Sequence, residues 1–258
     1  MQRLGMSQDR LPWKTAWVIG ASSGIGAATA KRLSSAGVKV VVSARTEGAL
    51  EELAATSANL CVQTVDVTDD ASVGAAFNAV MDKIGVPDLV LYSAAVYTPG
   101  GLSVLTGDEA MHHMDVNYGG AVRTLQAVLP SMMEVGRGGV GIVSSLTGYA
   151  GLPNAAVYGP TKAALISLCE TIKPELDASG VALSVINPGF VRTPLTEKNT
   201  FEMPFIIEPD QAASHIVAGL RRGKFDIAFP WQMAVMLKFI RLLPYPIYFR
   251  FMKRLLRS

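Results

Sequence analysis

Short runs of β-branched and other apolar residues alternate along the chain with longer segments in which apolar residues recur every three or four positions. The short runs are mostly apolar without alternation, which is typical of strands covered on both faces. This order predicts parallel strands joined by crossover helices in a doubly wound α/β fold. The predicted strands are Ala16–Gly20, Lys39–Ser43, Leu60–Val65, Leu89–Ala94, Val140–Ser144, Ala182–Ile186 and Phe225–Phe229. The predicted helices are Ile25–Ala36, Glu47–Thr56, Ala71–Ile84, Asp108–Val135, Ala155–Ala178 and Asp210–Arg222.

The chain shows no internal repeat, no low-complexity segment and no linker long enough to separate two domains. We therefore predict a single domain over residues 1–230, with an irregular insertion at Thr193–Glu208, followed by a C-terminal extension over residues 231–258.

Composition narrows the class of protein. Of 258 residues, 50% are hydrophobic and 17% are charged, with a formal net charge of +2, which excludes a disordered chain. Cys61 and Cys169 are the two cysteines, each in an apolar segment, so we expect no disulfide framework and a reducing compartment. Residues 1–13 lack the apolar centre of a signal peptide, and no run of about 18 uncharged apolar residues suggests a membrane span. We expect a cytoplasmic protein.

A glycine-rich loop, Gly20 to Gly26 (GASSGIG), follows the first predicted strand and leads directly into a helix. Gly20 lets the chain turn out of the strand, Gly24 lets backbone approach a pyrophosphate, and Gly26 allows close helix–strand packing. The free amides at the start of the helix attract phosphate. Such a loop alone could be a plain turn, but its place in the first strand–helix unit favours dinucleotide binding.

The end of the second strand carries Arg45 and no acid. An Asp or Glu at this place normally binds a free ribose 2′-hydroxyl, whereas an Arg accommodates a 2′-phosphate. Because a guanidinium can bind phosphate in bidentate fashion, we predict a preference for NADP(H). Two alternatives stay open: Arg45 only caps a helix start in solvent, or nearby Glu47 allows NAD(H).

Tyr158 and Lys162 lie one helical turn apart and so share a helix face. A neighbouring ammonium stabilises a phenolate, so we expect the pKa of Tyr158 to be lowered toward the working range of an acid/base catalyst. Taken alone, such a pair is usually a coincidence on a surface. Here Ser144 and Ser145 end an apolar strand at the same edge of the sheet, where ligands of α/β proteins bind.

In order and spacing, these motifs resemble the short-chain dehydrogenase/reductase family over about residues 14–230. The resemblance is also carried by Asp66-Val67, Asn117, and Asn187-Pro188-Gly189 followed by Val191 and Thr193. It implies a three-layer Rossmann-type fold with a mostly seven-stranded parallel sheet, and NAD(P)-dependent hydride transfer.

The resemblance also implies roles for single residues. Tyr158 would be the general acid of reduction or the base of oxidation, and Lys162 would lower its pKa and hold the nicotinamide ribose. Ser145 would hydrogen-bond the substrate oxygen, Asn117 would hold a water of the proton relay, and Asp66 would meet the adenine edge. The cofactor-binding residues expected from the loop, from Arg45 and from the resemblance are Gly20, Ser22, Ser23, Gly24, Ile25, Gly26, Arg45, Asp66, Val67, Ala94, Tyr158, Lys162, Pro188, Gly189, Val191 and Thr193.

Two features depart from the family's pattern. Tyr92-Ser93-Ala94-Ala95 stands where the family usually has Asn-Asn-Ala-Gly, so we expect the backbone at Ala95 to sit differently beside the cofactor. Ile19 stands where the glycine motif often has Thr. His112 and His113 fall on different helix faces and lack further ligands at metal-binding spacing, so we expect no metal site.

The C-terminal extension is strongly basic. Residues 231–258 hold six of the chain's 23 Lys and Arg residues and no acid. Placed at helical steps, Ile247–Arg257 has a cationic side opposite an apolar side, a pattern typical of helices in a membrane interface. The cationic side is Arg250, Lys253, Arg254 and Arg257, and the apolar side is Tyr248, Phe251, Met252 and Leu255. One hypothesis is docking on anionic lipid at the inner face of a membrane; the other is packing on the body or on a second subunit. Nucleic acid fits poorly, because the basic residues are confined to this short segment.

The sequence therefore predicts an enzyme that transfers hydride between NADP(H) and a carbonyl or secondary alcohol on a hydrophobic, lipid-like substrate. Apolar segments at Val96–Leu105, Leu146–Asn154 and Thr193–Glu208 are the expected pocket walls. The alternatives are an NAD-linked alcohol dehydrogenase of the same family and a non-catalytic nucleotide-binding scaffold. Members of the family that the chain resembles commonly pair through long helices, so the resemblance also implies a homodimer or homotetramer, formed here through Asp108–Val135 and Ala155–Ala178.

Overall fold

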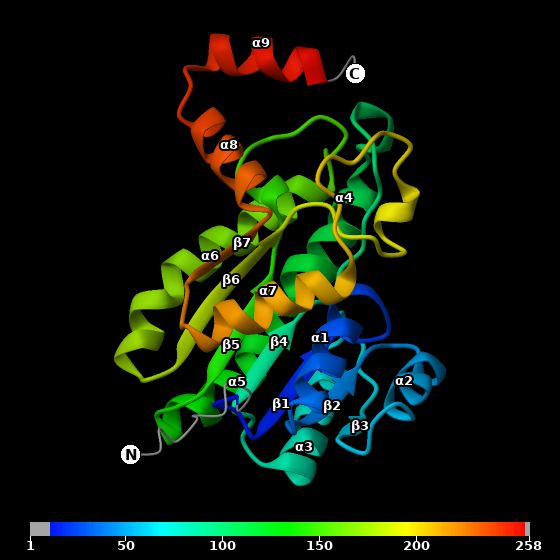
Figure 1. Cartoon of the computed structure of the whole chain (residues 1–258), viewed down its shortest axis with the longest axis vertical. Helices are drawn as coiled ribbons and strands as arrows, with labels where there is room; N and C mark the ends of the chain where they lie inside the picture. The colour runs from blue at the N-terminus through cyan, green and yellow to red at the C-terminus, as the bar shows by residue number, and fades with distance from the viewer. Residues whose placement is uncertain (1–10, 256–258) are drawn as a thin grey trace, which may run out of the picture.

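A computed structural model describes residues 11–255, and within them a single parallel sheet has seven strands in the order β3-β2-β1-β4-β5-β6-β7 (Figure 1). The order reverses between β1 and β4, which is the place where doubly wound sheets bind ligands at the carboxyl ends of their strands. The predicted parallel sheet is confirmed. The strands are β1 Thr15–Ile19, β2 Lys39–Ser43, β3 Leu60–Val62, β4 Leu89–Tyr92, β5 Gly139–Val143, β6 Ala182–Pro188 and β7 Asp226–Phe229.

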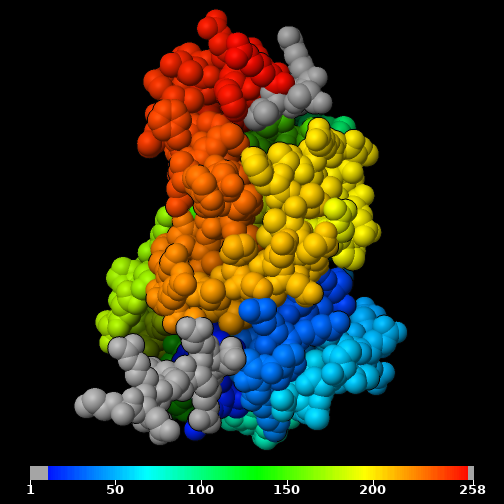
Figure 2. All heavy atoms as spheres, viewed as in Figure 1, coloured from blue at the N-terminus to red at the C-terminus, as the bar shows by residue number. Residues whose placement is uncertain are grey.

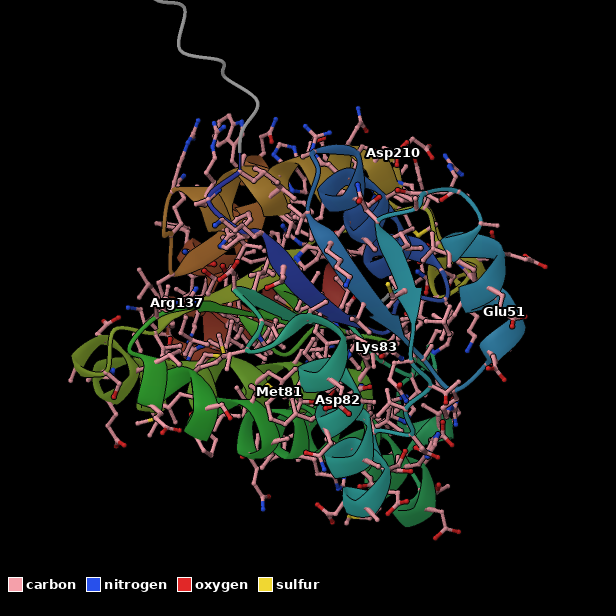
Figure 3. All side chains as sticks on the ribbon, turned by 90° about the horizontal axis from the view of Figure 1, so that it is seen from below. Glu51, Met81, Asp82, Lys83, Arg137 and Asp210 are labelled. Carbon is pink, nitrogen blue, oxygen red and sulfur yellow. The ribbon has the colours of Figure 1, made fainter. Side chains whose placement is uncertain are left out.

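Helices cover both faces of the sheet and complete the three predicted layers. Apolar side chains of α1 (Gly24–Ser35), α2 (Glu47–Ala54) and α7 (Pro209–Arg221) pack in one core. Those of α3 (Asp70–Ile84), α5 (Gly120–Val135) and α6 (Tyr158–Ala178) pack in another. Figure 3 shows the two layers from the amino ends of the strands, with Asp210 of α7 on one side and Met81 and Asp82 of α3 on the other. Because β4 and β5 are buried along their whole length, they read as unbroken apolar runs.

The predicted long helix Asp108–Val135 differs from the structure in its middle. It consists of α4 (Gly107–His113), a π-helical segment at Met114–Gly119, and α5. A π-helical segment inserts one residue into the helical repeat, which periodicity alone cannot reveal. Two further bounds differ by three residues: α6 begins at Tyr158 instead of Ala155, and the strand ladder of β3 ends at Val62 instead of Val65. Short 3₁₀ turns lie at Leu102–Val104, Leu146–Gly148 and Thr196–Lys198.

The C-terminal extension forms two helices, α8 (Trp231–Arg241) and α9 (Tyr245–Leu255), beyond the carboxyl end of the sheet (Figure 1). The inner side of α8 is buried in the same core as α3, α5 and α6, through Met233, Ala234, Leu237 and Ile240. Tyr248 and Met252 of α9 are also buried, so part of the predicted apolar side packs on the body. Arg257 lies outside the described residues. Among residues 11–255, no helix has both the length and the apolar character needed to cross a bilayer.

Candidate active site

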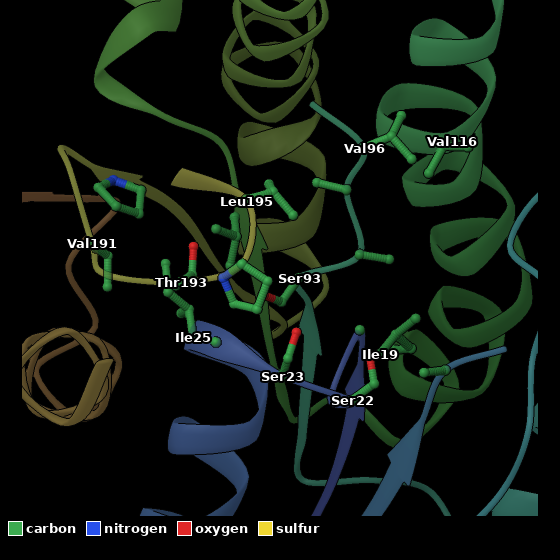
Figure 4. A pocket seen from close by; sticks show the side chains of 18 of the residues that line it. Ile19, Ser22, Ser23, Ile25, Ser93, Val96, Val116, Val191, Thr193 and Leu195 are labelled. Carbon is green, nitrogen blue, oxygen red and sulfur yellow. The ribbon is translucent and has the colours of Figure 1, made fainter. Parts of the chain in front are cut away.

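One cavity at the carboxyl end of the sheet collects most of the predicted site residues (Figure 4). It lies at the switch point between β1 and β4 and is walled on the far side by the chain that follows β6. The predicted residues that line it are Gly20, Ser22, Ser23, Gly24, Ile25, Arg45, Val67, Ala94, Ser145, Tyr158, Lys162, Pro188, Gly189, Val191 and Thr193. Gly26, Asp66 and Asn117 do not line it. Residues as far apart in sequence as Gly20 and Thr193 thus face one space.

At the three glycines of the glycine loop, neighbouring atoms leave no room for a Cβ. Gly20 and Gly24 have φ angles of +83° and +56°, which glycine adopts most readily. A Cβ on Gly26 would lie 2.1 Å from the Gly20 carbonyl oxygen, and a Cβ on Gly20 would lie 2.3 Å from the Ala94 nitrogen. Gly26 therefore acts from behind the cavity, by letting the helix pack against the turn.

The start of α1 fits the pyrophosphate of a dinucleotide. Ser23 is the N-cap residue, and its side chain makes no capping hydrogen bond to the helix. The first amides of α1 thus have no partner from the cap, and the Ser22 and Ser23 hydroxyls face the cavity with them (Figure 4). Both charged side chains that line the cavity, Arg45 and Lys162, are cations. This combination suits a ligand rich in phosphate.

Arg45 is exposed at the rim of the cavity, where β2 ends, and no acid lines the cavity beside it. Asp66 lies near this rim, and its Oδ1 accepts hydrogen bonds from the Thr68 amide (2.9 Å) and hydroxyl (2.7 Å). These two bonds hold the pKa of Asp66 below its usual value, with a smaller contribution from Arg45. Asp66 is therefore a carboxylate at neutral pH.

Tyr158 is the first residue of α6, and Lys162 follows one turn later. The Lys162 Nζ lies 5.3 Å from the centre of the Tyr158 ring and donates a hydrogen bond to the Val143 carbonyl (2.9 Å). Burial lowers the pKa of Lys162 to about 7. Burial also raises the pKa of Tyr158 above that of a free phenol, and Tyr97 raises it further, whereas a hydrogen bond with Ser145 lowers it.

The pKa expected from the sequence is therefore corrected. A lysine one turn away was expected to lower the pKa of Tyr158. In the structure, the burial of Tyr158 is the largest influence on this pKa and raises it. Lys162 is itself buried and donates its hydrogen bond to the backbone. Tyr158 is a neutral phenol at pH 7, which is the form that donates a proton.

Ser145 and Ser144 have different contacts. The Ser145 hydroxyl accepts from the Thr147 amide (3.1 Å) and donates to the Pro188 carbonyl (3.4 Å), so it ties the segment after β5 to the last residue of β6. The Ser144 hydroxyl donates to the Lys162 carbonyl (2.8 Å) and fixes the start of α6. Ser145 is also the serine that hydrogen-bonds Tyr158.

Asn117 is fully buried behind the cavity and acts as a brace. Its Oδ1 accepts from the Val96 amide (2.8 Å), and its Nδ2 donates to the Val96 carbonyl (3.1 Å) and to Thr161 Oγ1 (3.0 Å). These bonds join the loop after β4 to the helix that carries Tyr158. The water expected at Asn117 remains a prediction.

Tyr92 supports the π-helical segment that carries Asn117. Its hydroxyl is buried and donates to the Val116 carbonyl (2.6 Å). A π-helical segment shifts the backbone hydrogen bonds from the regular pattern, and a side-chain donor satisfies a carbonyl there. The departure from the family's asparagine at this position therefore has a structural role that sequence reasoning missed.

Tyr97 is a second residue of the site that was not singled out from the sequence. Its ring packs edge-on against that of Tyr158, with 4.9 Å between centroids, and its hydroxyl donates to Asn199 Oδ1 (2.6 Å). Asn199 belongs to the irregular insertion, so this bond closes the insertion over the loop after β4. The only signal in the sequence was that Tyr97 lies in the expected pocket wall, Val96–Leu105.

A cluster of hydrogen bonds around Asp226, at the start of β7, joins the C-terminal extension to the site. Asp226 accepts hydrogen bonds from the Tyr149 hydroxyl (2.7 Å), the Asn187 side chain (2.9 Å) and the Lys238 ammonium. Burial alone would raise the pKa of Asp226, but these donors hold it below its usual value. Since Tyr149 follows Ser145 and Asn187 precedes Pro188, Asp226 braces both segments, and α8 supplies the charge that balances it.

Comparison with known proteins agrees with this geometry. The family model of the short chain dehydrogenases matches residues 14–203. An uncharacterized oxidoreductase of Myxococcus xanthus is 36% identical over 242 residues, which cover 92% of this chain and 96% of the relative.

Solved structures give the same result. A short-chain dehydrogenase from Streptomyces avermitilis superposes with a TM-score of 0.77 at 27% identity, covering 87% of this chain and 91% of that protein. An alcohol dehydrogenase from Thermococcus sibiricus, complexed with 5-hydroxy-NADP, has a TM-score of 0.76 at 26% identity, covering 84% and 95%. The chain therefore belongs to the short-chain dehydrogenase/reductase family and is an NAD(P)-dependent oxidoreductase.

Proposed function

We propose that the protein uses NADP(H) to interconvert a carbonyl and an alcohol on an apolar substrate, with Tyr158 as the group that gives and takes the proton. The observation that carries the proposal is that Tyr158, Ser145 and Lys162 line the same cavity as the glycine loop and Arg45. A proton donor, a second hydroxyl and a phosphate-binding loop thus share one space.

Each of the three side chains has a different role in the reaction. A bound nicotinamide would supply a hydride to the carbonyl carbon, or accept one from the alcohol carbon. In reduction the substrate oxygen gains negative charge, which the Ser145 hydroxyl stabilises by a hydrogen bond while Tyr158 transfers its proton to that oxygen. Lys162, close to the ring, stabilises the phenolate that remains. Because the pKa of Tyr158 is raised, its phenol is protonated at neutral pH, which is the form that reduction requires.

Arg45 supports the choice of NADP(H) over NAD(H). It lies at the end of β2 with no acid among the residues that line the cavity, which is the arrangement suited to a 2′-phosphate. The similar alcohol dehydrogenase from Thermococcus sibiricus was solved with 5-hydroxy-NADP, which agrees with this choice. NAD(H) stays the alternative, since Glu47 begins the helix that follows.

Apolar walls support a hydrophobic substrate. Val96, Val116 and Leu195 project toward the cavity beside the proposed catalytic residues (Figure 4). Such walls favour apolar substrates but discriminate weakly between chain lengths. We further propose that the protein acts in the cytoplasm as a homodimer or homotetramer, paired through the exposed sides of α5 and α6.

The test is a turnover assay with NADPH and, in parallel, NADH over a panel of aldehydes and ketones of increasing hydrophobicity. We expect NADPH oxidation that is fastest with apolar ketones, and a loss of about 10²–10³ in kcat in Ser145→Ala, because a donor to the developing charge is removed. Tight NADPH binding without turnover of any carbonyl would instead support the non-catalytic scaffold.

A further inference from the structure

An apolar stripe runs along the outward side of α8 and continues onto α9. On α8 and its last turn, Trp231, Val235, Phe239 and Leu242 recur every three or four residues and are 69, 58, 65 and 81% exposed. On α9, Tyr245 and Phe249 are 74 and 54% exposed, and their rings stack with 5.6 Å between centroids. We call these six residues the tail stripe. Single exposed apolar side chains are ordinary, but a continuous set of this kind marks a surface that meets something.

The tail stripe cannot be buried by a small rotation of the helices, because their inner side is already fixed. Met233 and Leu237 of α8 are buried in the main core, and Arg241 donates to the Tyr149 carbonyl (3.1 Å). The Tyr248 hydroxyl donates to the Gly151 carbonyl, and Lys238 pairs with Asp226. The stripe is therefore held outward by the same contacts that hold the helices.

The charge around the stripe is of one sign. Residues 231–258 carry six bases and no acid. In the part of the chain that the structure describes, Arg241, Arg250, Lys253 and Arg254 are exposed on the same two helices. In a symmetric contact between two copies through this surface, cations would face cations with no acid to pair with them. An anionic lipid surface offers the complementary charge, and Trp, Tyr and Phe are the side chains that favour a bilayer interface.

We propose that the tail stripe and its flanking cations dock the protein on the surface of an anionic bilayer, with α8 and α9 lying in the interface. The side of α9 that enters the lipid differs from the one expected from the sequence: Tyr248 and Met252 pack on the body, while Tyr245 and Phe249 face outward. Figure 2 shows α9, in red, at one end of the molecule, with α8, in orange, leading up to it along the side of the body.

The mouth of the cavity lies at the same end. The large apolar side chains that are exposed in residues 11–255 lie mainly in three places. These are α8 and α9 with the turn between them, the segment from β4 to α5, and the segment from β6 to α7. Met133 and Val135 are the exceptions. The two segments contribute Leu102, Leu105, Met111, Phe201 and Phe205. Docking would thus turn the cavity toward the membrane, and an apolar substrate could enter from the lipid. This consequence rests on the proposed function, whereas the docking itself does not.

The test is cosedimentation of the full chain with vesicles of phosphatidylcholine alone or mixed with phosphatidylglycerol, without substrate. We expect binding to the anionic vesicles that weakens with added salt, and much weaker binding to the neutral ones. Phe239→Gln with Leu242→Gln should reduce binding about tenfold or more, because two large apolar side chains are lost from the contact. The matched control, Met133→Gln with Val135→Gln, removes two exposed apolar side chains at the end of α5; with gel filtration showing the same oligomer as the wild type, it should bind vesicles like the wild type.

A second variant tests the charge. Arg250→Gln with Arg254→Gln should weaken binding to anionic vesicles several-fold and flatten the salt dependence. Point variants are preferred to removal of α8, since removal would strip Met233 and Leu237 from the core; circular dichroism and cofactor titration check that each variant is folded.

Three results would overturn the proposal: no binding to either vesicle, equal binding to both, or equal binding of the stripe and control variants. A concentration-dependent dimer that Phe239→Gln with Leu242→Gln abolishes, without vesicle binding, would show that a second copy covers the stripe. Failure of the turnover assay would leave the docking untouched, because vesicle binding is measured without catalysis.

Discussion

The two halves of the sheet serve the cavity by different means. In the half formed by β1–β3, the cavity is shaped by backbone: Gly20, Gly24 and Gly26 bring the first helix against the turn and leave its amides free. In the half formed by β4–β6, it is shaped by side chains such as Tyr158 and Lys162. Function in the first half therefore depends on glycines that have no side chain. In the second half it depends on how deeply a few polar side chains are buried and on their hydrogen-bond partners.

The largest effect on cofactor binding is expected from adding one methyl group to the backbone half. In Gly26→Ala the new Cβ would lie 2.1 Å from the Gly20 carbonyl oxygen, so the loop must shift away from the helix. We expect NADPH affinity, measured by titration calorimetry, to fall about 100-fold or more. Gly48→Ala is the control, because a Cβ there meets nothing within 4 Å and alanine favours a helix. Equal affinity of the two variants would contradict the backbone account.

In the side-chain half, Lys162→Met should separate stability from activity. The pKa of Lys162 falls from 10.5 to about 7 on folding, so between these values the unfolded chain binds more protons than the folded one. The destabilisation is therefore fully present below pH 7 and is relieved as pH rises from 7 to 10.5. We expect the variant to lose activity but to melt several degrees higher at pH 6.5, by about 2–4 °C for each kcal/mol gained.

Melting curves at several pH values check this prediction. The gain in melting temperature should shrink steadily above pH 7, whereas Lys31→Met, at an exposed position on α1, should show no such trend. A melting temperature of Lys162→Met below that of the wild type at pH 6.5 would mean that the lysine stabilises the fold.

A smaller effect is expected at the rim of the backbone half. Arg45→Ala should weaken NADPH binding about tenfold or more, because a charge-assisted bidentate contact is lost, and should leave NADH binding nearly unchanged. The NADPH affinity of Arg45→Lys should lie between those of the wild type and Arg45→Ala. Lysine keeps the positive charge but cannot make the two parallel hydrogen bonds of a guanidinium. Equal losses for both cofactors would remove the basis for preferring NADP(H).

The smallest effect is expected from Tyr92→Phe, which removes only the hydroxyl that satisfies the Val116 carbonyl. We expect a loss of about 1–2 kcal/mol in unfolding free energy by urea denaturation, the usual cost of an unpaired buried acceptor. Because Asn117 lies next to Val116, kcat should fall while KM changes little. Unchanged stability would show that the π-helical segment does not need this bond.

The same contrast explains how much could be predicted from the sequence. The strands, the glycine loop and the positions of Tyr158 and Lys162 were predictable because each depends on residues close together in sequence. The Tyr97–Asn199 bond, the Asp226 cluster and the Tyr92–Val116 bond join distant segments, so no local pattern reveals them. The direction of the pKa shift at Tyr158 was wrong because spacing predicts a neighbouring charge but not the depth of burial.

The central claim is that Tyr158 transfers the proton at a cavity built for a dinucleotide, and single-turnover kinetics of Tyr158→Phe test it most directly. With NADPH saturating and an apolar ketone from the panel, the account predicts a rate of hydride transfer about 10²–10⁴ lower than that of the wild type. It also predicts that NADPH affinity falls far less than this rate, because one hydroxyl among many cofactor contacts is lost. A variant that reduces the ketone at the wild-type rate would contradict the account.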